Sequence, residues 1–288
     1  MVKSAIVWIF VLATSLMGCG ERAKESDQVP TILNYWEAYD FSDTTNFQTP
    51  DVGEQAVVDF LDLAQRSEYS NYVEAINNTF DRASKTPTAL KYLLDNFERY
   101  LYDPNSPMYN EMLYFPVLAF VSKSNLFEEY ERARFSERLN LLKRNNPGSK
   151  AANFSYQTPD GTKNDLYSQI EIPTLLFFYE PGCGGCADAI DKLHATPEVK
   201  SWVERGDVAI LAIYATADQK SWEEYQPYIP SYCVNGINLD KSIIGHNLYD
   251  LKASPTFYLL DGKKDVVLKD CSLEDAVQLL AESIHAPN

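Results

Sequence analysis

The stretch TLLFFYEPGCGGCADAIDKL occupies residues 174–193, and it decides the fold of the second half of the chain. Residues 174–179 form a nearly continuous apolar run, which is typical of a strand buried on both faces of a sheet. A Pro-Gly turn follows, and we expect a helix from about Cys183. Cys183 and Cys186 therefore stand together at a predicted strand-to-helix junction.

Two cysteines three residues apart lie on one helical face, close enough for a disulfide to open and close with little backbone movement. Unpaired N–H groups and the helix dipole favour an anion at the helix start. Cys183 is therefore the candidate attacking thiolate, and Cys186, one turn deeper, is the candidate resolving thiol.

Two other interpretations of the pair are a metal site and an inert disulfide. Structural zinc usually takes four ligands from two such pairs, and the chain has one pair, with Cys233 and Cys271 isolated and three scattered histidines. We therefore expect no metal. Whether Cys233 and Cys271 pair with each other stays open.

The N-terminal residues predict export. Residues 1–18 combine Lys3 with a short apolar run, as in a signal peptide, and the run is too short to remain as a membrane span. Residues 16–19 (LMGC) resemble the lipobox of bacterial lipoproteins, which implies a lipid on Cys19; an ordinary cleaved signal with a chance cysteine is the alternative. Polar residues 19–30 would form a tether. We expect a lipid-anchored protein of the bacterial cell envelope, facing the periplasm or the cell surface.

Length, composition and net charge limit the number of domains and the kinds of binding partner. The chain has 288 residues, 45% of them hydrophobic, which is enough for two cored domains. Its net charge of −16 would repel phosphate backbones, so we expect no nucleic-acid binding.

Residues 31–146 show helical periodicity, and their many Tyr and Phe side chains either fill a core or form a binding surface. NNPG at 145–148 is the strongest linker signal. In residues 150–288 strands alternate with helices, which predicts an α/β domain with a mixed sheet. The elements expected there are a hairpin near 154–161, strands at 174–179 and 208–214, a helix opened by Ser221, a hairpin at 255–269 and a last helix capped by Ser272.

This order, with ASPT at 253–256 opening the last hairpin, resembles the thioredoxin fold, and more narrowly the TlpA/ResA-type thioredoxin-like bacterial lipoproteins. The all-helical first part resembles a domain of unknown function found ahead of that module, most clearly in LYDPNSP at 101–107. The resemblance implies a cis Pro255 beside the cysteines, and Ser254 offering backbone groups to an extended substrate segment.

Several positions depart from the thioredoxin pattern. Phe177 stands where thioredoxin has a buried aspartate, and Gly182 stands where it has a tryptophan. Glu180 is a candidate proton relay in place of the missing acid, unless it is only an exposed loop carboxylate. The dipeptide Gly184-Gly185 leaves the direction of reaction open among reduction, oxidation and isomerisation.

We therefore expect a thiol–disulfide oxidoreductase that exchanges disulfides with protein substrates through Cys183 and Cys186. It needs no organic cofactor or metal, but a redox partner must recycle the cysteine pair. The alternative is a non-catalytic binding or scaffolding lipoprotein that retains the fold.

Overall fold

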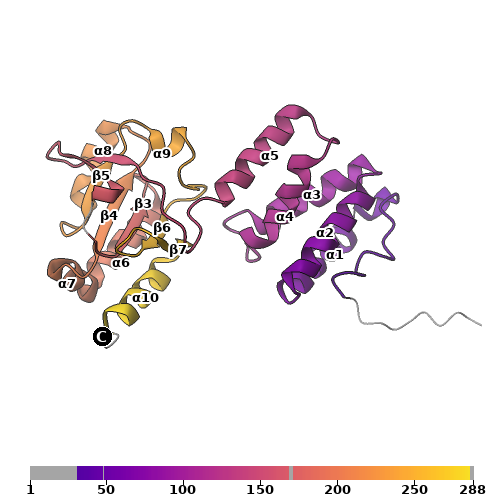
Figure 1. Ribbon diagram of the computed structural model, residues 1–288, viewed down its shortest axis with the longest axis horizontal. Coiled ribbons are helices and arrows are strands. Elements are labelled where there is room, and N and C mark those ends of the chain that lie inside the picture. The colour runs from indigo at the N-terminus through magenta and orange to yellow at the C-terminus, as the bar shows by residue number, and fades with distance from the viewer. Residues whose placement is uncertain (1–30, 48, 169–170, 286–288) are drawn as a thin grey trace, which may run out of the picture.

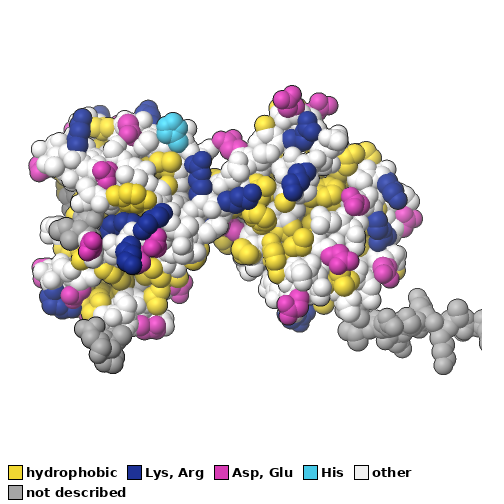
Figure 2. Space-filling view, in the orientation of Figure 1, with side chains coloured by type: hydrophobic (Ala, Val, Ile, Leu, Met, Phe, Trp, Pro, Cys, Tyr) yellow, Lys and Arg dark blue, Asp and Glu magenta, His cyan; other side chains and the backbone are white. Residues whose placement is uncertain are grey.

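The computed structural model describes residues 31–47, 49–168 and 171–285. The predicted signal peptide, Cys19 and the tether lie outside these residues. The described chain forms an all-helical part and a part built on a sheet, side by side (Figure 1). Figure 2 shows the same two lobes joined at a narrower waist, with charged side chains of both signs scattered over this face of each. The predicted fold class, a helical bundle ahead of an α/β thioredoxin fold, is confirmed.

The helical part buries one core. Its aromatic side chains, such as Trp36, Phe60, Phe80 and Phe97, pack inside that core, so most of them fill it rather than form a binding surface. Asn110 caps the fourth helix by accepting a hydrogen bond from the N–H of Leu113 at 3.1 Å. The elements are η1 Thr44–Phe47, α1 Pro50–Gln65, α2 Tyr69–Ala83, α3 Pro87–Leu101, α4 Glu111–Lys123 and α5 Glu129–Leu142.

The described residues of the second part form a sheet of seven strands in the order β2-β1-β5-β4-β3-β6-β7. The central strands β3, β4 and β5 are parallel, and β6 runs antiparallel to β3. The strands are β1 Ser155–Gln157, β2 Lys163–Asp165, β3 Thr174–Phe178, β4 Ala209–Tyr214, β5 Val234–Ile237, β6 Thr256–Leu260 and β7 Val266–Cys271. The helices are η2 Leu166–Ser168, α6 Gly184–Ala195, α7 Pro197–Arg205, α8 Gln219–Tyr225, η3 Gln226–Tyr228, α9 Ser242–Gly245 and α10 Leu273–His285.

Both faces of this sheet are covered. Leu175 and Phe177 pack against side chains of α6, α7 and α10, whereas Leu176 and Phe178 pack on the other face with α9. Alternate residues of one strand thus enter two cores, which explains why β3 reads as an unbroken apolar run.

One local prediction needs correction, and one strand was missed. The helix expected to open at Ser221 begins at Gln219, and Asp218 caps it by accepting from the N–H of Ser221 at 3.4 Å. Strand β5 was not predicted, because Val234–Ile237 contains Asn235 and Gly236, which strands disfavour. A Cβ on Gly236 would lie 2.6 Å from a ring carbon of Tyr156, so packing against Tyr156 requires glycine there.

The predicted linker is bound to the last hairpin. Asn145 is buried, the N–H of Gly148 donates to the carbonyl of Val266 at 2.8 Å, and that of Ala151 to the carbonyl of Lys264 at 3.0 Å. Domain boundaries at 146 and 150 stay a prediction.

Candidate redox site

The cysteine pair lies at the start of α6, at the carboxyl end of β3. Cys183 is the N-cap residue, and its Sγ accepts a hydrogen bond from the N–H of Cys186 at 3.2 Å. The Sγ of Cys183 therefore lies in the field of the helix N-terminus, where negative charge is favoured. Cys183 is partly exposed and Cys186 is fully buried, which agrees with the roles of attacking and resolving thiol.

A tight turn presents Cys183 in this position. Gly182 has φ = +81°, a conformation that residues with a side chain rarely adopt, and the N–H of Cys183 donates to the carbonyl of Glu180 at 3.1 Å. A tryptophan at 182, as in thioredoxin, would be strained here.

The loop before β6 lies against the first cysteine. The Ser254–Pro255 peptide bond is cis, and the Cys183 thiol donates to the carbonyl oxygen of Ser254 at 3.3 Å. A Cβ on Gly185 would lie 3.1 Å from Pro255 Cδ, so glycine allows α6 and this loop to approach closely. We call residues 250–255 the cis-proline loop.

The two thiols differ in their surroundings. Burial, followed by the hydrogen bond with Cys183, raises the pKa of Cys186 to about 12. Cys186 is therefore a neutral thiol at physiological pH and needs a base to lose its proton when it attacks.

No acid lies at the thioredoxin position beneath the pair. Phe177 is fully buried and stacks on Phe257 of β6, with ring centroids 4.7 Å apart. Glu180 is half-buried, accepts from Thr216 Oγ1 at 2.7 Å, and its negative charge is one of the smaller causes that raise the pKa of Cys186. Among these two positions only Glu180 can exchange a proton.

Sequence reasoning missed an aromatic wall beside the cysteines. Asn235 Oδ1 accepts from Tyr179 Oη at 2.9 Å and from Trp222 Nε1 at 3.1 Å, which fixes the Tyr179 ring. Tyr225 stacks on Tyr179, and Tyr228, 61% exposed, contacts Tyr225 with centroids 5.0 Å apart. Burial and the nearby cysteines raise the pKa of Tyr225. The only sequence signal was the tyrosine-rich run at 225–232.

A cavity of about 300 Å³ lies against the cis-proline loop. Its lining includes Glu180, Ser254 and Lys252 from the sheet part and Leu141 from α5 of the helical part. The cleft next to the redox site is therefore built by both parts of the chain.

The two other described cysteines form no disulfide. Cys233 and Cys271 are free, partly buried thiols packed against the core, and burial raises the pKa of each to about 12. Within the described residues, no group of three or more His, Cys, Asp or Glu could hold a metal ion. No helix in that same part of the chain is long and apolar enough to cross a membrane.

A strand-to-helix cysteine pair facing a cis-proline loop defines the class of thioredoxin-like proteins. Residues 32–145 match a family described as a domain of unknown function (DUF5106). A thioredoxin-like protein from Bacteroides caccae is 35% identical, with a TM-score of 0.79, over 88% of this chain and 91% of that chain. The chain belongs to the thioredoxin-like proteins that carry this domain of unknown function ahead of the thioredoxin fold.

Two further structures match about half of the chain. The C-terminal domain of an uncharacterized protein from Bacteroides fragilis is 38% identical over 48% of this chain and 99% of that chain, with a TM-score of 0.46. A thiol-disulfide oxidoreductase from Bacteroides fragilis is 20% identical over 47% and 99%, with a TM-score of 0.40. A search of curated proteins gave no match.

Proposed function

We propose that this protein is a thiol–disulfide oxidoreductase of the bacterial cell envelope, held to a membrane by a lipid on Cys19. One observation carries the redox assignment: the Cys183 thiol sits at the N-terminus of α6, 3.3 Å from the carbonyl of Ser254 in the cis-proline loop. An inert disulfide needs neither partial exposure of its first sulfur nor a loop that meets it.

The exchange proceeds in two balanced steps. The Cys183 thiolate attacks one sulfur of a protein disulfide; a mixed disulfide forms, and the other substrate sulfur leaves as a thiolate that takes up a proton. Cys186 then loses its proton, with Glu180 as the candidate acceptor, and attacks the Cys183 sulfur. The Cys183–Cys186 disulfide forms, the second substrate thiol is released, and two electrons have passed to the substrate. A dithiol donor must then reduce the pair again; the reverse sequence oxidises a substrate dithiol.

The surroundings of the pair support a polypeptide substrate. Tyr225 and the exposed Tyr228 provide apolar contact area near the cysteines, and the cavity lined by both parts of the chain adjoins Glu180 and Ser254. Ser254 would pair through its backbone with an extended substrate segment, a mode that depends on main-chain hydrogen bonds and tolerates varied sequences.

Trapping of mixed disulfides tests this function. Cys186→Ser should accumulate covalent complexes between Cys183 and client proteins, since the resolving thiol is lost, whereas Cys183→Ser should accumulate none. Non-reducing gels of envelope extracts, together with disulfide reduction and oxidation assays on the purified wild type, provide the readout. Equal, negligible trapping by both variants and an inactive wild type would favour the alternative, a binding or scaffolding lipoprotein.

A further inference from the structure

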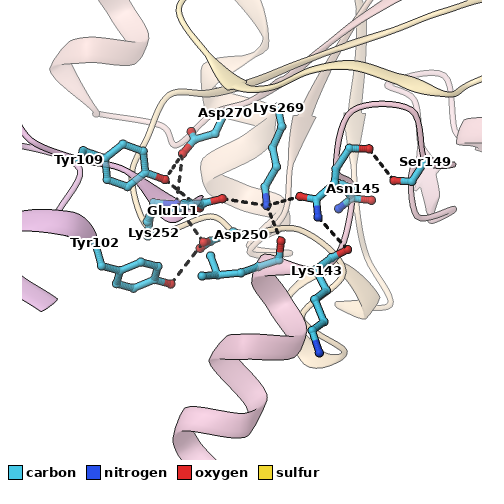
Figure 3. A network of polar contacts seen from close by, with 12 residues as sticks. Tyr102, Tyr109, Glu111, Lys143, Asn145, Ser149, Asp250, Lys252, Lys269 and Asp270 are labelled. Atoms are coloured by element: carbon cyan, nitrogen blue, oxygen red, sulfur yellow. Dashed lines mark hydrogen bonds and ion pairs between the residues drawn. The ribbon is translucent and has the colours of Figure 1, made fainter. Parts of the chain in front are cut away.

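A buried ion cluster joins the helical part to the cis-proline loop (Figure 3). The Nζ of Lys252, three residues before Pro255, lies 2.8 Å from Glu111 Oε1, 2.9 Å from Asp250 Oδ2 and 3.2 Å from Asp270 Oδ2. Glu111 is the first residue of α4, so the contact bridges the two parts of the chain. The Lys252 side chain is only 11% exposed.

A second lysine, Lys269, binds the other carboxylate oxygen of Glu111. Lys269 Nζ lies 2.9 Å from Glu111 Oε2 and donates to the carbonyl of Leu142, the last residue of α5, at 3.0 Å. Lys269 and Asp270 are neighbours, whose side chains would point to opposite faces of a regular strand. The register of β7 shifts here and Asp270 has φ = +48°, a bulge that lets both side chains reach the cluster.

Two tyrosines of the helical part extend the cluster. Tyr109 Oη donates to Glu111 Oε1 at 2.8 Å, and Tyr102 Oη donates to Asp250 Oδ2 at 3.3 Å. The Lys252 ammonium also lies 5.0 Å and 5.2 Å from the two ring centroids, within the range of cation–π attraction. Burial opposes ionisation of Glu111, yet the two lysines hold its pKa below the ordinary value, so the cluster stays charged.

A buried ion cluster fixes the relative positions of its side chains more than it raises the free energy of unfolding. Taking charges out of water costs about as much as their attraction returns, but removing one partner leaves an unpaired buried charge. The arrangement therefore favours a single relative placement of its members. Of the members, Asp250 and Lys252 belong to the cis-proline loop.

The path from Lys252 to the redox site is short. Only Ala253 separates Lys252 from Ser254, whose carbonyl accepts from the Cys183 thiol at 3.3 Å. Thr256 Oγ1 donates to the carbonyl of Ala253 at 2.6 Å, so the loop has little freedom between the cluster and β6.

We propose that the helical domain positions the substrate-binding loop: Glu111 holds Lys252, and Lys252 is a positioning residue that sets Ser254 and Pro255 against Cys183. This inference rests on the proposed function and assigns a role to the domain of unknown function. The position of the loop then depends on Glu111, which lies 72 positions before Cys183 in the sequence and contacts neither cysteine.

The test compares Lys252→Met and Glu111→Gln in the full chain, with Lys252→Arg as the conservative variant. Lys200→Met is the matched control, because Lys200 is an exposed lysine of α7 whose ion pair with Glu204 is 3.6 Å long. Two rates are measured for each: alkylation of Cys183 by iodoacetamide, and reduction of the disulfides of insulin by the reduced protein. Deuterium uptake in residues 253–257 is measured in parallel.

Glu111→Gln and Lys252→Met should slow insulin reduction by about tenfold or more, because misplacing binding groups by about 1 Å lowers rates by up to about a hundredfold. Alkylation of Cys183 should not slow, since the start of α6 is untouched and loss of the Ser254 carbonyl as hydrogen-bond acceptor leaves the thiol freer to react. Deuterium uptake at 253–257 should rise in both variants, the control should match the wild type, and Lys252→Arg should recover most of the rate.

Failure of the inference and failure of the function give different results. A wild type that does not reduce insulin counts against the proposed function, and the deuterium uptake then still decides the positioning role. If Glu111→Gln leaves both the insulin rate and the uptake at wild-type values, or slows alkylation as much as insulin reduction, the helical domain does not position the loop. Should Lys252→Met fail to fold, Glu111→Gln decides the positioning role by itself.

Discussion

The two glycines between the cysteines lie in different surroundings, and alanine at each position tests the contact between α6 and the cis-proline loop. A Cβ on Gly184 meets no atom within 4 Å, whereas a Cβ on Gly185 lies 3.1 Å from Pro255 Cδ and 3.6 Å from the carbonyl oxygen of Ser254. Both residues belong to α6, so the backbone accepts alanine at either position.

The two substitutions should differ in their effect on the free energy of unfolding. Alanine is more favourable than glycine in a helix by up to about 1 kcal/mol, so Gly184→Ala should stabilise the protein by about 0.5–1 kcal/mol. At Gly185 the same gain is opposed by a contact shorter than the usual carbon–carbon separation of about 3.5–4.0 Å. Overpacking of this kind costs about 1–3 kcal/mol, so Gly185→Ala should destabilise the protein by about 0–2.5 kcal/mol.

The same crowding should affect the redox reaction. Alanine at 185 pushes Pro255 and the Ser254 carbonyl away from Cys183, so reduction of a protein disulfide should slow, whereas Gly184→Ala should retain the wild-type rate. Urea unfolding and insulin reduction measure the two effects on the same samples. If Gly185→Ala stabilises the protein as much as Gly184→Ala does and keeps the wild-type rate, α6 and the loop are not in close contact.

Two further predictions concern the buried thiols and the anchor. Burial is the main cause that raises the pKa of Cys186, Cys233 and Cys271 from 9.0 to about 12, so between those pH values an unfolded chain loses thiol protons that the folded chain keeps. The free energy of unfolding should therefore fall as pH rises above about 9. Cys233→Ala should make this fall less steep, as urea unfolding at several pH values would measure. An unchanged dependence on pH in that variant would count against a raised pKa of Cys233. Cys19→Ser should release the protein into the soluble fraction or block its processing, as fractionation and mass spectrometry would detect, and a variant that stays membrane-bound and normally processed would rule out the lipid anchor.

The sequence predicted the redox part of the molecule because its signals are local. An apolar run followed by a turn and Cys-x-x-Cys specifies strand, turn and helix within twenty residues, and ASPT at 253–256 adds the loop through the resemblance. Structure and sequence agree on strands β3, β4, β6 and β7 and on the helix capped by Ser272, whose Oγ accepts from the N–H of Asp275 at 3.0 Å.

Prediction failed where the neighbours of a residue come from elsewhere in the chain. Strand β5 has weak strand propensity, and it forms because β4 and β1 supply partners and because Gly236 fits against Tyr156. The wall of Tyr179, Tyr225 and Tyr228 depends on Asn235, which fixes Tyr179 from a strand that was not predicted.

The sequence alone thus determined that two cysteines stand at a helix start in a thioredoxin fold, since strand, turn and helix signals lie within a few residues of one another. Only the tertiary structure brought Glu111 of the helical part within 2.8 Å of Lys252, across 141 positions of sequence. A lysine and a glutamate that far apart look like ordinary surface charges, and only burial makes their pairing specific, because an unpaired charge in that environment is costly. The link between the helical domain and the cis-proline loop therefore became visible only in the folded chain.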